Sequence, residues 1–197
     1  MLKQFIILSA FLCVGSLGFC QVDSLDEFNR ERVQLTKHGM LALATWGGIN
    51  LLYSGIAAGS ASGSNQYFHR MNLAWGGVNF AIGTLGYLLT KNKEGYGYAQ
   101  TLHKQQAMEK IYLLNTGLDV AYIVGGFYFR ERANNIAAKH DRLKGYGNSI
   151  ILQGSALFVY DGIMYLIHNN HGKKMDRFID KMQIGFALNQ LSCVVKL

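Results

Sequence analysis

The sequence predicts an all-α protein, a bundle of four antiparallel helices that each cross a membrane. Apolar residues make up 50 % of the 197 residues and charged residues 16 %, whereas typical soluble domains contain about 25 % charged residues. The charges are also segregated, which leaves four stretches with at most one charged residue each. A span needs about 20 mostly apolar residues, and a soluble helix would show a charged face every turn or two. We therefore predict four spans, at about residues 38–59, 68–90, 111–129 and 147–168.

Residues 1–20 have the pattern of a secretory signal peptide. Lys3 precedes the apolar run Phe5–Phe19, and Gly18-Phe19-Cys20 has the small-x-small form of a cleavage site. Two alternatives stay open. Cys20 could be the lipidated residue of a lipoprotein signal, or the segment could be an uncleaved anchor that gives a fifth span.

Cleavage would place the mature amino terminus outside the cytoplasm. The basic stretch at 130–145 would then lie inside, as the positive-inside rule requires. The stretches at 91–110 and 173–181 are also basic and would lie outside. The charges therefore do not fix the orientation, which rests on the predicted signal peptide.

Between the signal peptide and the tail, residues 21–175 form the predicted transmembrane domain. Ser24 and Glu27 have the spacing of a capping box, which predicts that a helix begins at Ser24 and continues into the first span. The polar stretch Ala99–Lys110 is predicted to lead without a break into the third span. In the tail, residues 176–197, apolar residues alternate with small or polar ones on both sides of Asn189-Gln190. This alternation predicts a short β-hairpin.

The first two predicted spans share a five-residue pattern, Trp46-Gly47-Gly48-Ile49-Asn50 and Trp75-Gly76-Gly77-Val78-Asn79. Such self-similarity indicates duplication of one structural unit. The asparagine of each pattern falls near the middle of its span, as does one aspartate in each of the other two spans. At a rise of about 1.5 Å per residue, four adjacent helices would hold these side chains at one depth, the bilayer centre. The candidate polar centre, with two nearby amides, is Asn50, Asn79, Asn115, Asp119, Gln153 and Asp161.

The leading interpretation of this polar centre is interhelical packing, with each hydrogen bond contributing about 0.6–2 kcal/mol. The alternative is a proton or small-solute path, or a small-ligand pocket, that uses Asp119 and Asp161 with support from Asn50 and Asn79. Ionisable groups at this depth normally face the bundle interior or a water cavity, and both interpretations satisfy that rule. Small residues spaced four apart predict close helix contacts: Gly55, Gly59, Gly117, Ala121 and Gly125.

The histidines suggest a third and remoter function, a haem- or metal-binding redox protein. His168 and His171 form an HxxH pair, and the predicted topology places His38 and His103 at the same membrane face. Without carboxylate or cysteine ligands at a metal-site spacing, the simpler interpretation is that these are interfacial polar residues. We therefore expect no metal or other cofactor.

The remaining composition narrows the partners and the activity. The net charge of +7 comes from basic residues at the predicted span ends, which suits anionic lipid headgroups and does not indicate nucleic acid. The sequence contains no phosphate-binding loop, no HExxH and no GxSxG, so it favours a non-enzymatic protein. The expected partners are the lipid bilayer and a membrane-protein partner or a second copy of the chain.

Four segments carry a resemblance to a known family: Tyr67–Trp75, Leu114–Asp119, Arg142–Gly147 and Gln153-Gly154. They resemble a family of uncharacterised bacterial membrane proteins known as a domain of unknown function. The resemblance implies a helical protein of the bacterial inner membrane, and the family has no agreed activity to transfer. The resulting hypothesis is a structural or interaction protein, with a small proton-linked transporter or channel as the alternative.

Overall fold

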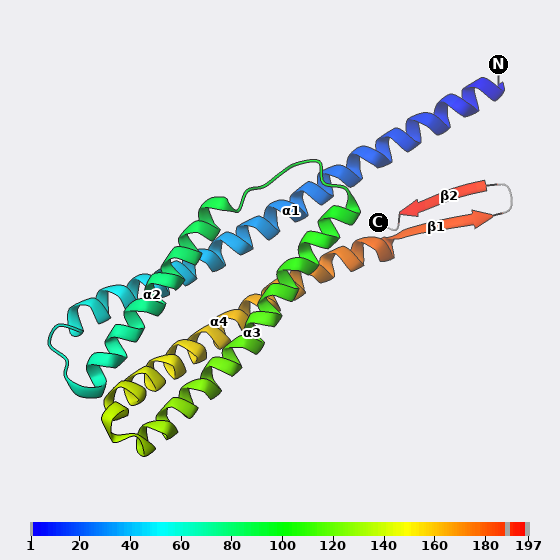
Figure 1. Cartoon of the computed structure of the whole chain (residues 1–197). Coiled ribbons are helices and arrows are strands. Elements are labelled where there is room, and N and C mark those ends of the chain that lie inside the picture. Colours follow the sequence, from blue (N-terminus) through cyan, green and yellow to red (C-terminus); the bar gives the residue numbers. More distant parts are fainter. Residues whose placement is uncertain (1, 188–189, 196–197) are drawn as a thin grey trace.

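The computed structural model describes the backbone of residues 2–187 and 190–195 and the side chains of residues 25–175. The all-α prediction is confirmed, because four long helices dominate the structure (Figure 1), and each predicted span falls on one of them. The helices are α1 (Leu2–Ala57), α2 (Gly63–Leu89), α3 (Tyr98–Asn135) and α4 (His140–Lys181), with a 3-10 helix, η1 (Ala137–Lys139), before α4.

Two segments are long and apolar enough to cross a membrane by length and composition. They are Leu25–Ala57 of α1, and Ala137–Met175, which comprises η1 and most of α4. No comparably apolar stretch is found in α2 or α3, where glycines and polar residues are interspersed among the apolar ones. Two of the four predicted spans therefore lie in segments that are apolar enough to cross a membrane.

The helices pack as two hairpins, α1 with α2 and α3 with α4, and the hairpins meet mainly through α2 and α4. Glycines allow close backbone approach within each hairpin. A Cβ atom at Gly76 would lie 3.0 Å from the carbonyl oxygen of Gly47. A Cβ atom at Gly147 would lie 2.7 Å from the carbonyl oxygen of Gly126. The duplicated Trp-Gly-Gly pattern thus packs against itself where α1 meets α2.

The helix contacts predicted from small residues spaced four apart are wrong for α3. A Cβ atom at Gly117 or Gly125 would meet nothing within 4 Å among the described side chains. Gly55 makes only ordinary contact, with Leu73 Cδ2 at 3.8 Å from its Cβ position, and Gly59 lies beyond the end of α1. A spacing of four places residues on one face of a helix, but it does not determine which face meets a neighbour.

The predicted helix start at Ser24 is also wrong. α1 is continuous from Leu2 through this position. A capping box stabilises a helix end only where the preceding chain leaves the helical conformation. The apolar run before Ser24 contains no proline, and in the structure it is helical. The continuous course predicted from Ala99 into the third span is present, because α3 runs from Tyr98 to Asn135.

α1, α3 and α4 continue past the end of α2, so the bundle is longer on that side (Figure 1). There Leu25, Phe28 and Met175 form a small buried apolar cluster. The link between α2 and α3 is tied to α1, because the backbone N–H of Gly95 donates to Asp26 Oδ1 at 3.0 Å. Gly95 has a φ of 77°, a conformation that glycine adopts without steric cost.

Two strands follow α4: β1 (Met182–Ala187) and β2 (Gln190–Val195). They pair antiparallel, with Ile184 opposite Cys193. Residues 188–189, in the turn of the predicted hairpin, lie outside the described residues. The hairpin as a whole therefore stays a prediction.

Polar side chains predominate in the interior of the bundle, and many large apolar side chains are exposed on its outer surface. The largest side chains with less than 2 % exposure are all polar: His168, Gln105, Gln153, Asn29, Asn72, Thr101, Ser54 and Ser149. Large apolar side chains point outward on every long helix instead, with Ile56 of α1 82 % exposed and Leu89 of α2 73 % exposed. Soluble proteins bury their aliphatic side chains preferentially, so this distribution is the inverse of theirs.

Candidate functional site

Gln153 of α4 is fully buried, and its side-chain amide makes four hydrogen bonds. Nε2 donates to Asn50 Oδ1 at 2.9 Å and to Asn72 Oδ1 at 3.0 Å. Oε1 accepts from Trp46 Nε1 at 3.0 Å and from Asn79 Nδ2 at 3.4 Å. An amide offers two donor hydrogens and two acceptor lone pairs, so Gln153 has no unused hydrogen-bonding capacity.

Further bonds extend this cluster, which we call the amide network. Ser149 Oγ donates to Asn72 Oδ1 at 2.7 Å, and Asn50 Nδ2 donates to the carbonyl oxygen of Trp46 at 2.8 Å. The network joins α1, α2 and α4, and no residue of α3 takes part in it among the described side chains. Its members are Trp46, Asn50, Asn72, Asn79, Ser149 and Gln153.

Sequence reasoning named Asn50, Asn79 and Gln153 but missed Asn72 and Ser149. A signal for both was present in the helical spacing. Asn72 precedes Asn79 by seven residues and Ser149 precedes Gln153 by four, so each shares a helix face with a residue that was identified.

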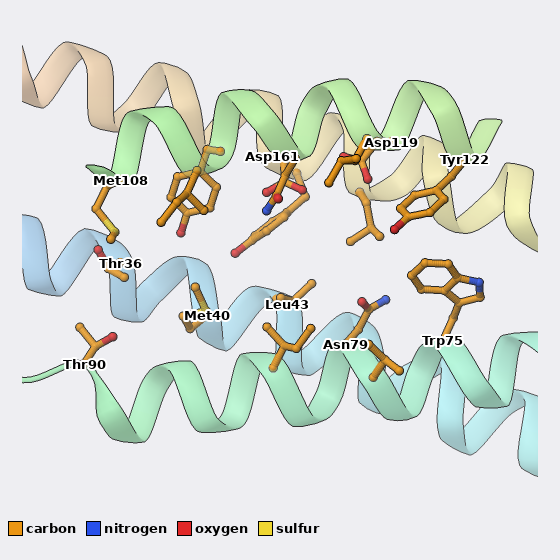
Figure 2. A pocket seen from close by; sticks show the side chains of 18 residues that line it. Thr36, Met40, Leu43, Trp75, Asn79, Thr90, Met108, Asp119, Tyr122 and Asp161 are labelled. Atoms are coloured by element: carbon orange, nitrogen blue, oxygen red, sulfur yellow. The ribbon is translucent and has the colours of Figure 1, made fainter. Parts of the chain in front are cut away.

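The other predicted polar residues, Asn115, Asp119 and Asp161, lie at a second site. They line a cleft of about 410 Å³ between α2 and α3, with α1 and α4 behind it. Figure 2 shows Asp119 and Tyr122 entering the cleft from α3, and Asn79 entering from α2. Asn79 therefore belongs to the amide network and also borders the cleft.

Of the six buried side-chain polar atoms that have no hydrogen-bond partner among the described residues, three belong to residues that line this cleft. Asp161, Asn115 and Asp119 all lie in the lining of the cleft. Asp119 Oδ2 and the hydroxyl groups of Tyr112 and Tyr160 are buried and have no hydrogen-bond partner within the part of the chain that the structure describes. Buried polar groups are nearly always hydrogen-bonded, so three unpaired groups around one cleft distinguish it from the saturated amide network.

A third polar cluster lies where α1, α3 and α4 extend past α2. His171 is buried and stacks on Phe28, with the ring centroids 4.0 Å apart. Its Nδ1 contacts Gln105 Oε1 at 3.2 Å and its Nε2 contacts Glu31 Oε2 at 3.1 Å. Glu31 also accepts a hydrogen bond from Lys174 Nζ at 2.6 Å. This cluster links all three extended helices.

The charges of this third cluster follow from burial and pairing. The hydrogen bond from Lys174 lowers the pKa of Glu31 below its ordinary value and keeps the carboxylate ionised. Burial lowers the pKa of His171, although the neighbouring Glu31 opposes that shift. A neutral imidazole carries one N–H, so it can donate to only one of its two oxygen neighbours, Glu31 or Gln105.

The histidines proposed as weak metal ligands are not gathered at one place. His38 and His103 are exposed, on α1 and α3. His168 is buried and stacks on Tyr112, with the ring centroids 5.3 Å apart. Among the residues with described side chains, no group of three His, Cys, Asp or Glu residues is placed to hold a metal ion. His168 and His171 are both buried inside the bundle, stacked on Tyr112 and Phe28 respectively.

Fold and sites together define a class, that of helical-bundle proteins with a hydrogen-bonded polar interior and an apolar exterior. The chain belongs to a family of unknown function (DUF6992), whose family model matches residues 42–162. The match confirms the resemblance to an uncharacterised domain family, and it spans the amide network and both cleft aspartates. No curated protein matches the chain, and no solved structure matches it.

Proposed function

We propose that the chain is an integral membrane protein with four spans, in which the amide network is a structural element. The burial pattern carries this proposal, because polar side chains predominate in the interior while many large aliphatic side chains are exposed on the outside. In a bilayer, polar side chains are satisfied between helices and apolar ones face lipid. In water, the same arrangement would expose extensive apolar surface without the burial that stabilises a soluble fold.

The outward faces of α2 and α3 support spans on these helices despite their lower mean hydropathy. Leu88 of α2 is 60 % exposed, and Leu114 and Val124 of α3 are 66 % and 62 % exposed. α2 has 27 residues, which at about 1.5 Å per residue exceeds the 30 Å or so of a hydrocarbon core. Its glycines and asparagines lower the mean hydropathy, and several of them face the neighbouring helices.

The amide network supports a structural or interaction protein over a transporter. A transport path needs polar groups that can exchange partners with the solute. Gln153 has none to spare, because all four of its hydrogen-bonding positions are occupied by α1 and α2. The network thus holds three helices in register, and the apolar outer faces are free to contact lipid, a membrane-protein partner or a second copy of the chain.

The second candidate, a small proton-linked transporter or channel, is favoured by one separate observation. Asp119 and Asp161 lie outside the amide network, and Asp119 Oδ2 is buried at the cleft without a partner. Protonation of this pair could accompany movement of a solute. Asp119→Asn and Asp161→Asn distinguish the candidates. A variant that is stable in detergent but has lost the in-cell function would contradict the packing role of the pair.

Membrane embedding is tested by alkaline carbonate extraction together with reporter fusions in the three links between helices. We propose the inner membrane of a bacterium, with the mature amino terminus outside. Fusions in the α1–α2 and α3–α4 links should then report the cytoplasm, and fusions in the α2–α3 link and after Lys181 should report the outside. Release of the full chain by carbonate, or one compartment for all fusions, would refute the four-span arrangement.

A further inference from the structure

The cleft between α2 and α3 has an unusual combination of surfaces. Most of its lining is aliphatic or aromatic, and it holds two carboxyl groups, those of Asp119 and Asp161. No lysine, arginine or histidine is among the residues that line it. Trp75 of α2 and Tyr122 of α3 meet across the cleft in an edge-to-face contact, with their ring centroids 5.1 Å apart (Figure 2). The site is therefore apolar and aromatic, with acidic groups that no protein cation balances there.

Two of its polar groups are buried and unpaired. Asp119 is 2 % exposed and its Oδ2 has no hydrogen-bond partner among the described residues. Tyr112 is 3 % exposed and its hydroxyl group is likewise unpaired there. Leaving a buried acceptor or donor unsatisfied costs free energy, and the cost is larger for a charged group. A molecule that donates hydrogen bonds to Asp119 would remove much of this cost.

We propose that the cleft binds a lipophilic amine, a small molecule with an aromatic or aliphatic body and one ammonium group. The ammonium group donates hydrogen bonds to Asp119 and Asp161 and supplies the positive charge that the lining lacks. The rings of Trp75 and Tyr122 attract the same cation through their π faces. The volume of about 410 Å³ falls within the range of drug-sized ligand sites.

The amine reaches the cleft from the side. The pairs α1–α2 and α3–α4 pack closely, and the hairpins meet mainly through α2 and α4. The gap between α2 and α3 is thus the open side, and aliphatic side chains flank it on the outer surface. This lateral route rests on the proposed membrane embedding, because a bilayer at that side would concentrate amphipathic amines. The binding chemistry itself does not depend on the route.

The test compares 4-phenylbutylamine with 4-phenylbutanol, two probes that differ in the charged group, on the purified full chain in detergent. Trp75 lies at the cleft, so tryptophan emission follows binding. We expect the amine to bind at least about tenfold more tightly than the alcohol, a difference equivalent to about 1.4 kcal/mol. Asp161→Asn and Asp119→Asn should each weaken amine binding about tenfold and leave alcohol binding unchanged. Asp141→Asn is the matched control, because Asp141 is exposed.

Equal affinity for both probes, or no binding of the amine, would overturn the proposal. Loss of amine binding in Asp141→Asn as well would do the same, because the effect would then not belong to the cleft. If both cleft variants fail to fold, the comparison of the two probes on the wild-type chain still tests whether the cleft prefers the amine. Carbonate extraction is measured separately. A chain that stays in the membrane but does not bind the amine would contradict this inference and leave the membrane proposal standing.

Discussion

Replacing Gln153 with methionine tests the amide network most directly, because methionine has a similar volume and flexibility but cannot replace the amide. The change removes four hydrogen bonds. Interhelical bonds in membrane proteins contribute about 0.6 kcal/mol each, which gives a lower figure of about 2.4 kcal/mol. Trp46 Nε1 and Asn50 Oδ1 would also lose their partners, at a further cost for each unpaired buried group. We expect the free energy of unfolding to fall by about 2–4 kcal/mol.

The measurement is unfolding of the purified chain in mixed micelles, titrated with sodium dodecyl sulphate and followed by the helical circular dichroism signal. Gln106→Met is the matched control, because Gln106 is exposed on α3, and we expect it to change stability by less than about 0.5 kcal/mol. Trp46 emission should also shift in Gln153→Met, since its indole N–H loses an acceptor. A loss of less than about 0.5 kcal/mol would show that the amide network does not stabilise the bundle.

Two further predictions concern the close contact between α1 and α2 and the third polar cluster, around His171. Gly76→Ala should destabilise the chain by about 1–3 kcal/mol, because the new Cβ would lie 3.0 Å from Leu51 N. Gly77→Ala, whose Cβ meets nothing within 4 Å, should be neutral or stabilising; equal effects in the two micelle titrations would refute the proposed contact. Burial lowers the pKa of His171 from its ordinary 6.5, so this side chain binds protons more readily in the unfolded chain than in the folded one. The free energy of unfolding should therefore fall as the pH drops below about 6.5. His171→Gln should make the free energy of unfolding less dependent on pH, and His103→Gln should leave that dependence unchanged. A free energy of unfolding that rises toward acidic pH would refute the attribution to His171.

The sequence predicted the composition of the polar centre better than its arrangement. Regular helix rise grouped Asn50 with Asn79, and in the structure each of them hydrogen-bonds to Gln153. The same reasoning placed Asp119 and Asp161 in one network with them, whereas these two line a separate cleft. Depth in a bundle follows from counting residues along a helix. The rotation of each helix about its axis depends on packing against its neighbours, which no single span encodes.

The glycines show the same limit. The duplicated Trp-Gly-Gly pattern predicted that α1 and α2 are related, and the structure adds that the first glycine of each pattern lies at the contact. The second glycine of the α2 pattern, Gly77, meets nothing within 4 Å. On α3, the close contact is made by Gly126 and not by its neighbour Gly125. Adjacent residues on a helix point about 100° apart, so composition identifies the glycine-rich turn but not which glycine faces the partner helix.

The two polar sites divide the four helices unequally, and this division explains why the cleft exists. α1, α2 and α4 are fixed to one another by the amide network, in which every position of Gln153 is used. α3 contributes nothing to that network among the described residues and is held chiefly by α4. Packing therefore leaves α3 apart from α2, and the unpaired groups of Asp119 and Tyr112 lie on α3, beside the resulting gap. Among the described residues, Asn79 is the one side chain that hydrogen-bonds to Gln153 and also borders the cleft. Asn79 therefore connects the amide network with the lining of the cleft.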